Sequence, residues 1–101
     1  MVAKNYSVVW TIRSQQHLKK IFEYTNEDSQ QNALKVLEDI VSAVDKAIAN
    51  PEFYAADKYK LKNDGSYRTF EIHHYRIANR FDNNTIRVLR VRHTALEPKY
   101  Y

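Results

Sequence analysis

The stretch GSYRTFEIHHYRIANRFDNNTIRVLRVRH, residues 65–93, decides the fold. β-Branched and aromatic residues dominate it, and polar residues suited to turns interrupt it. We expect three strands, Tyr67–His73, His74–Phe81 and Thr85–His93, with a turn at Asp82-Asn83-Asn84 before the last of them. Strands joined by such short turns are antiparallel neighbours, so the stretch predicts a three-stranded antiparallel sheet.

A further turn is expected before the first of these strands, at Asn63-Asp64-Gly65-Ser66. Gly65 is the only glycine of the chain and takes a positive φ without steric cost. The segment before it, Pro51–Lys62, is irregular, but lysines alternate there with other residues in a way that allows a short strand. The alternating positions are Lys58, Tyr59, Lys60, Leu61 and Lys62.

Upstream of the sheet, Tyr6–Ile12 has the composition of a strand, and a helical spacing follows it. Ser14 is placed to cap the first helix by accepting a hydrogen bond from an early N–H. Apolar residues and a threonine then recur at i, i+3, i+4 and i+7, which is one face of an amphipathic helix. These positions are Leu18, Ile21, Phe22 and Thr25.

A second helix is expected after the polar break Asn26-Glu27-Asp28-Ser29, which can also cap it. Its apolar residues fall on one stripe, formed by Ala33, Val36, Leu37, Ile40, Val44, Ala47 and Ile48. Asn50-Pro51 should end it, because a residue before proline avoids the helical region. Two helices joined by a short loop form an antiparallel hairpin.

The element order is therefore β-α-α-β-β-β in one domain, residues 1–101, of the α+β class. The chain has no cysteine and is compatible with a reducing cytosol. The apolar run near its N-terminus is too short for a signal peptide or a membrane span. We expect a soluble cytoplasmic protein that does not enter a membrane.

Positive charge is concentrated in the second half of the chain. Residues 58–93 hold nine of the sixteen Lys and Arg residues but only three acids, Asp64, Glu71 and Asp82. Six of the seven arginines lie between Arg68 and Arg92. Such a segment favours an anionic partner, either nucleic acid or an acidic peptide; a solvated basic face without a ligand is the alternative.

The arginines lie within the strands, several on the same faces as core-type residues. Alternation places Arg90 and Arg92 with Ile86 and Val88 in the last strand, opposite Arg87, Leu89, Val91 and His93. It places Arg68 with Phe70 and Ile72, and Arg76 and Arg80 with His74 and Ala78. Because a buried arginine needs a carboxylate, the surplus predicts an open basic groove, unless Glu23, Glu38 or Asp39 of the helices supply partners.

The sequence contains no phosphate-loop, dinucleotide or zinc motif, and we expect no metal and no cofactor. His73 and His74 should point to opposite faces of a strand and fill structural or surface roles. His93 ends the last strand beside Arg92, ahead of a tail that closes with Tyr100-Tyr101. It either anchors that tail or does acid–base work at a phosphodiester.

The segment from Gly65 to Tyr101 resembles the C-terminal half of the RelE/ParE superfamily toxins of bacterial type II toxin–antitoxin systems. The resemblance rests on Gly65-Ser66-Tyr67-Arg68, on Tyr75-Arg76-Ile77, and on a last strand ending in Arg92-His93-Thr94 with Glu97-Pro98 after it. The N-terminal half matches too, with a strand followed by a helical hairpin that Leu18-Lys19-Lys20-Ile21 opens. The likeness covers nearly the whole chain.

This resemblance implies a small toxin that a cognate antitoxin neutralises. RelE-like members cleave messenger RNA in the ribosome, whereas ParE-like members inhibit DNA gyrase. The ending Arg92-His93-Thr94-x-x-x-Pro98 is similar to the ParE branch, so gyrase is the preferred target. The alternatives are a ribosome-dependent, metal-independent endoribonuclease and a small basic RNA-binding domain.

The resemblance also implies the residues that would act. If the chain is an endoribonuclease, the catalytic candidates are Arg68, Arg92, His93 and Tyr100. For binding the target or the antitoxin, the candidates are Lys60, Lys62, Arg68, Arg76, Arg90 and Arg92. Exposed aromatic residues on the sheet would favour the RNA-binding alternative.

Overall fold

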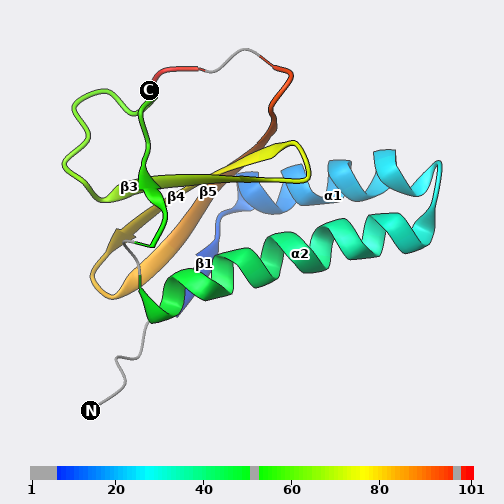
Figure 1. The fold of residues 1–101 in the computed structure, drawn as a ribbon, viewed down its shortest axis with the longest axis horizontal. Helices are drawn as coiled ribbons and strands as arrows, with labels where there is room; N and C mark the ends of the chain where they lie inside the picture. Colours follow the sequence, from blue (N-terminus) through cyan, green and yellow to red (C-terminus); the bar gives the residue numbers. More distant parts are fainter. Residues whose placement is uncertain (1–6, 51–52, 97–98) are drawn as a thin grey trace.

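The computed structural model describes residues 7–50, 53–96 and 99–101. Its elements, in chain order, are β1 Ser7–Trp10, α1 Ile12–Asn26, α2 Gln30–Ala49, β2 Ala55–Ala56, β3 Tyr67–Ile72, β4 Tyr75–Asp82 and β5 Thr85–His93. The two helices run antiparallel and lie on one side of a twisted sheet (Figure 1). This is the predicted α+β arrangement, a helical hairpin against a sheet.

The sheet has five strands in the order β1-β5-β4-β3-β2, two more than the predicted antiparallel unit. β3, β4 and β5 are antiparallel neighbours as expected. β1 joins the free edge of β5 in parallel, which the long connection through both helices and the strands β2, β3 and β4 permits. β2 adds a two-residue antiparallel edge to β3.

The short strand that the alternation of Lys58, Lys60 and Lys62 allowed is not formed, because these residues lie in turns and a bend. Local hydrogen bonds explain why. The backbone N–H of Tyr59 donates to the Asp57 carboxylate, and that of Lys60 donates to the Asp57 carbonyl. An aspartate that binds the backbone just ahead of it closes a turn rather than extending a strand.

The first helix is capped three residues earlier than predicted. The Thr11 hydroxyl accepts the Ser14 N–H and is the N-cap of α1, while Ser14 is buried within the helix and donates to the Thr11 carbonyl. Ser29 caps α2 as predicted by accepting the Asn32 N–H. That helix ends with Asn50 as its C-cap, as expected, whereas the predicted Pro51 lies outside the described residues.

The hydrophobic core lies between the helical hairpin and the sheet. The predicted stripe of α2 faces it: Ala33, Val36, Ile40, Val44 and Ala47 are buried and Leu37 is partly buried, while the side chain of Ile48 is not described. From the sheet, Phe70, Ile77, Val88 and Val91 pack against them. Burying each large aliphatic side chain contributes about 1.5–3 kcal/mol, which makes this layer the main source of stability.

A β-bulge in β5 overturns the predicted alternation of that strand. Ala78 pairs with Arg90 but Asn79 pairs with Val88, so Leu89 has no partner on β4. The extra residue reverses the two faces beyond it. Val91 therefore joins Val88 in the core, and Arg90 shares a face with Arg87 instead of with Val88.

The turns between the strands use residues with positive φ. His73 and His74 have φ values of 51° and 66° and form the β3–β4 turn. The prediction that they lie within strands is therefore wrong. Asn83 and Asn84, at 48° and 56°, form the β4–β5 turn where one was expected. Gly65 has a φ of 95° in its predicted turn. Two-residue hairpin turns with positive φ match the twist of the strands they join.

Candidate functional site

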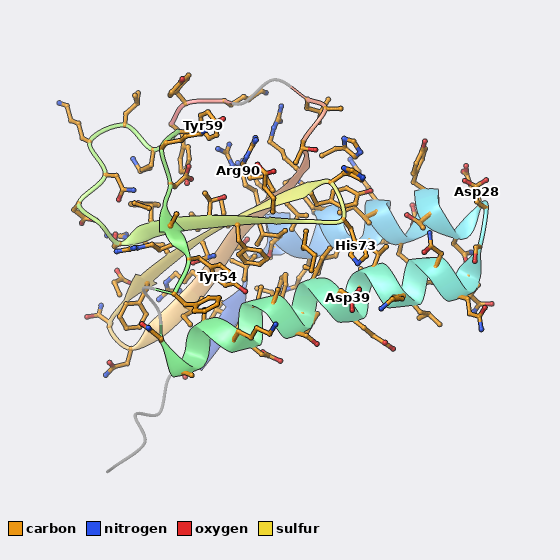
Figure 2. The ribbon with its side chains drawn as sticks, in the orientation of Figure 1. Asp28, Asp39, Tyr54, Tyr59, His73 and Arg90 are labelled. Carbon is orange, nitrogen blue, oxygen red and sulfur yellow. The ribbon has the colours of Figure 1, made fainter. Side chains whose placement is uncertain are left out.

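The sheet face turned away from the helices carries most of the arginines, and we call it the basic sheet face. It is formed by Lys60, Arg76, Arg80, Arg87, Arg90 and Arg92. Arg76 and Arg92 are direct neighbours across β4 and β5. In Figure 2, Arg90 and Tyr59 lie on the side of the sheet away from α2, whereas Asp39 lies on that helix and His73 lies toward it.

Tyrosine rings hold the cations of this face in place. The guanidinium carbons of Arg76, Arg80 and Arg90 lie 4.8, 5.0 and 4.2 Å from the ring centres of Tyr59, Tyr67 and Tyr101. The ammonium of Lys60 lies between two of these rings, 4.8 Å from Tyr67 and 5.2 Å from Tyr101. A cation over a ring face is attracted to it by about 0.5–2 kcal/mol, depending on its exposure.

A hollow of about 550 Å³ opens at the centre of this face, and we call it the arginine hollow. Its lining consists of five cations, two tyrosines, a threonine and a leucine. These residues are Thr11, Arg13, Lys60, Tyr67, Arg80, Arg87, Leu89, Arg90 and Tyr101. The hollow brings the start of α1 together with β3, β4, β5 and the tail.

Tyr101 is fixed over the sheet by hydrogen bonds of its backbone and of its side chain. Its backbone exchanges hydrogen bonds with Tyr59 and Leu61, and its hydroxyl donates to the buried carboxylate of Asp57 at 2.6 Å. Burial, together with this bond to Asp57, raises the pKa of Tyr101 well above its usual range. Tyr101 is therefore held protonated as an anchor of the tail.

The predicted Tyr100 has a different environment. It is 65% exposed, and its ring packs edge-on against Tyr59. It does not line the arginine hollow. Of the two tail tyrosines, the structure thus brings Tyr101, rather than Tyr100, among the arginines.

Carboxylates reach the basic sheet face from the strands. Glu71 binds Arg76 at 3.0 Å, and Asp82 approaches Arg80 and Arg87 at 3.7 and 4.0 Å. On α2, Asp39 instead pairs with His73 at 2.6 Å and with Lys35 at 3.2 Å, and these partners lower the pKa of its carboxyl.

Arg68 is separated from the other candidate arginines. It shares a sheet face with Phe70, on the side of the helices, and donates to the carbonyl oxygens of Gly65 and Tyr54 at 2.9 and 3.2 Å. Tyr54 in turn stacks on Phe70 and donates its hydroxyl to Ala43 of α2. These bonds give Arg68 a structural environment between loop and core.

Two histidines line a second hollow, of about 450 Å³, on the helix side of the sheet. His93 lies there with Tyr75 and accepts the Ala95 N–H through its Nδ1. His17 of α1 accepts the N–H of Val91 at 3.0 Å, beyond the point where β1 stops pairing with β5. Burial and nearby arginine and lysine charges lower the pKa of His17.

Lys62 is exposed in a turn with a φ of 53° and lies outside the lining of the arginine hollow. Of the binding residues predicted from the sequence, four lie on the basic sheet face: Lys60, Arg76, Arg90 and Arg92. Sequence reasoning missed Arg13, Tyr67, Arg80, Arg87 and Tyr101 as members of the hollow. Arg80 and Arg87 lie within predicted strands, as the chosen arginines do. Arg13, by contrast, reaches the hollow through the parallel pairing of β1 with β5.

The described residues contain no group of three or more histidine, cysteine or acidic side chains arranged to hold a metal ion. Within the same residues, neither helix has the length and apolar character that crossing a membrane requires.

Several solved structures share this fold. A chain of the chromosomal ParDE system from Pseudomonas aeruginosa is 22% identical with a TM-score of 0.68, and the match covers 87% of this chain and 95% of that one. A chain of the RelBE2 toxin–antitoxin complex from Mycobacterium tuberculosis is 19% identical with a TM-score of 0.57, covering 89% and 99%. A chain of the YoeB–YefM complex from Staphylococcus aureus is 16% identical with a TM-score of 0.53, covering 89% and 98%.

A helical hairpin on one face of the sheet and arginines on the other define the class: a small domain with the RelE/ParE fold. Sequence comparison assigns the chain to one family within this class. The family of ParE toxins of type II toxin–antitoxin systems, parDE, matches residues 8–97, and the chain belongs to that family. No curated protein sequence matches the chain significantly.

Proposed function

We propose that this toxin arrests bacterial growth from the cytoplasm by binding a protein, DNA gyrase, and that a cognate antitoxin neutralises it. Its membership of the ParE family supports the choice of gyrase. The single observation that carries the preference for binding over RNA cleavage is the scattering of the four candidate nuclease residues over different faces.

A metal-free cut in RNA needs a proton acceptor, a proton donor and cations around one phosphate. Arg92 lies on the basic sheet face, whereas His93 lines the hollow on the helix side. Arg68 donates to two backbone carbonyls, and Tyr100 packs on Tyr59 outside the arginine hollow. This placement does not bring an acid and a base to one phosphate.

Tyr101, the tyrosine that does lie among the arginines, is unsuited to act as a base. Its pKa is raised, and its proton is engaged with the Asp57 carboxylate. A general base at neutral pH needs a pKa near 7 and a lone pair directed at the proton that it takes. These two properties support a binding role for the basic sheet face.

We propose further that the antitoxin uses both sides of the molecule. Leu18, Phe22 and Leu37 line a groove of about 500 Å³ between α1 and α2, which suits the apolar side of an amphipathic helix. An acidic extended segment would then cross the basic sheet face, where complementary charge speeds association and makes it sensitive to salt. The similar solved structures are themselves toxin–antitoxin systems and complexes.

The alternative is a ribosome-dependent endoribonuclease, and the cluster of cations around the arginine hollow favours it. In that case the ribosome or the RNA itself would supply the missing acid–base group. The tyrosines beside those cations equally favour the third possibility, a plain RNA-binding domain.

Expression of the toxin in bacteria separates these functions. Growth should stop and resume when the antitoxin is co-expressed. A gyrase inhibitor should induce the DNA-damage response early while messenger RNA stays intact, whereas an endoribonuclease should give codon-phased cuts that depend on ribosomes. Normal growth with folded toxin present would contradict the toxic activity, and cuts in naked RNA would contradict both mechanisms.

A further inference from the structure

The arginine hollow holds more positive charge than its own carboxylates satisfy. Five cations line it, namely Arg13, Lys60, Arg80, Arg87 and Arg90. Two carboxylates stand near them. The buried Asp57 accepts hydrogen bonds from Tyr59 and Tyr101. Asp82 stays 3.7 and 4.0 Å from the two nearest guanidinium groups, beyond hydrogen-bond range.

Asp82 does not form hydrogen bonds with these arginines, and its Oδ1 is buried without a hydrogen-bond partner among the described residues. Arg80 and Arg90 each donate one hydrogen bond to a neutral group, Ser66 Oγ at 3.3 Å and the Lys99 carbonyl at 3.1 Å. A guanidinium has five N–H donors. Both side chains thus keep donors for an incoming anion.

The tyrosine rings position the guanidinium groups of these arginines. Tyr67 lies 5.0 Å from the guanidinium of Arg80, and Tyr101 lies 4.2 Å from that of Arg90. A ring holds a cation through its π face and uses none of the N–H donors at the edge. The arginines are therefore positioned without their hydrogen-bonding capacity being consumed.

The start of α1 adds to the positive potential. Thr11, the N-cap of this fifteen-residue helix, lines the arginine hollow, as does Arg13 in the first turn. The amino end of a helix carries a partial positive charge that favours anions. Cations from two strands, a loop and a helix thus converge on one space.

We propose that the arginine hollow binds the phosphate group of a nucleotide, either free or within a single-stranded nucleic acid. Arginine forks match the oxygens of a phosphate in a bidentate way, and four of the five cations are arginines. A hollow of about 550 Å³ also has room for more than a bare anion. Tyr67 and Tyr101 offer aromatic surface on which a base could stack.

Such a ligand is distinct from the toxin's target, and its binding can be measured without growth arrest. Purified toxin is titrated with a labelled single-stranded octanucleotide, followed by fluorescence anisotropy, at several salt concentrations. A combined Arg87→Ala and Arg90→Ala variant removes two cations from the hollow. The matched control, Lys35→Ala with Lys46→Ala, removes the same charge from exposed positions on α2.

The hollow variant should bind the octanucleotide at least tenfold more weakly, and its slope of log affinity against log salt should fall by roughly 1.4, since each lost phosphate contact removes about 0.7. The control should stay within about twofold of the wild type. Equal weakening of both variants would show attraction to net charge alone and would overturn the site. Thermal melting of both variants checks that each is folded.

Two further arms test the ligand class. Adenosine monophosphate should bind more tightly than ribose 5-phosphate and inorganic phosphate, and Tyr67→Leu should remove that advantage, because stacking needs a ring. Equal affinity for all three would contradict a nucleotide and leave only an oxyanion site. An acidic decapeptide that binds more tightly than the octanucleotide at equal charge would overturn the assignment in favour of a protein ligand.

Discussion

At the scale of single residues, arginines of similar sequence context have different structural roles. Arg68 and Arg87 both lie in strands of alternating character, yet Arg68 donates to two carbonyls on the helix side and Arg87 is exposed beside the arginine hollow. The alternation of β3 correctly predicted that Arg68 faces the same way as Phe70. It could not predict that backbone carbonyls, rather than a carboxylate, satisfy this arginine, since they come from segments without a regular period.

Replacing Arg68 by Ala should therefore destabilise the fold. The carbonyls of Gly65 and Tyr54 lose charge-assisted hydrogen bonds, and we expect a loss of about 1.5–3 kcal/mol in the free energy of unfolding. Arg87→Ala should change it by less than about 0.5 kcal/mol, as is usual at an exposed position. Urea unfolding of the two variants measures the difference. Equal stability of both would show that the bonds of Arg68 do not support the fold.

His17 should make stability depend on pH. Its Nδ1 accepts the Val91 N–H, and burial lowers the pKa of the ring below its ordinary value of 6.5. The unfolded chain then takes up a proton before the folded chain does, so stability is highest above pH 6.5 and falls as the pH drops below that value. We expect the unfolding midpoint in urea to decrease between pH 7.5 and pH 5.

His17→Asn isolates this effect, because the amide oxygen can accept from Val91 but does not titrate. The variant should lose less stability than the wild type over the same pH interval. The carboxyl groups, Asp39 among them, titrate alike in both proteins and cancel in the comparison. Identical dependence of stability on pH in both proteins would mean that protonation of His17 does not affect folding.

At the scale of elements, sequence reasoning located the helices and the three long strands but missed two features of the sheet. The bulge at Leu89 cannot be read from alternation, because it arises from the pairing of β5 with β4. The parallel β1–β5 pair joins segments almost eighty residues apart, which local patterns do not connect. Both features shape the arginine hollow, since they place Arg90 and Arg13 there.

The tail is the element whose role is most testable. Tyr101→Phe removes the hydroxyl that donates to the buried Asp57 and leaves that carboxylate with one partner fewer. We expect the free energy of unfolding to fall by about 1–3 kcal/mol, the usual result of leaving a buried acceptor short of a donor. Tyr100→Phe should change it little, because Tyr100 is largely exposed. The same loss in both variants would contradict an anchoring role for Tyr101.

At the scale of the whole molecule, the charge pattern of the sequence predicted a basic surface, and the fold divides the chain into an apolar helical side and a basic sheet side. Lys60, Arg76, Arg90 and Arg92 were candidates through the family resemblance and the positive charge of this segment, whereas strand alternation wrongly placed Arg90 with Val88. The sequence did not predict which residues line the arginine hollow, because Tyr101 and Arg13 reach it through tertiary contacts. The separation of His93 from this face likewise depends on the assembled sheet, because the bulge at Leu89 changes the face on which the end of β5 lies.

An assay with purified components tests most directly whether this ParE-family toxin acts by binding gyrase. DNA supercoiling by gyrase is measured with increasing toxin, with and without the antitoxin, and in parallel the toxin is incubated with messenger RNA and translating ribosomes. The account predicts that supercoiling is inhibited, that the antitoxin restores it, and that the messenger RNA stays whole. Full supercoiling activity at saturating toxin together with codon-phased cuts on the ribosome would contradict it.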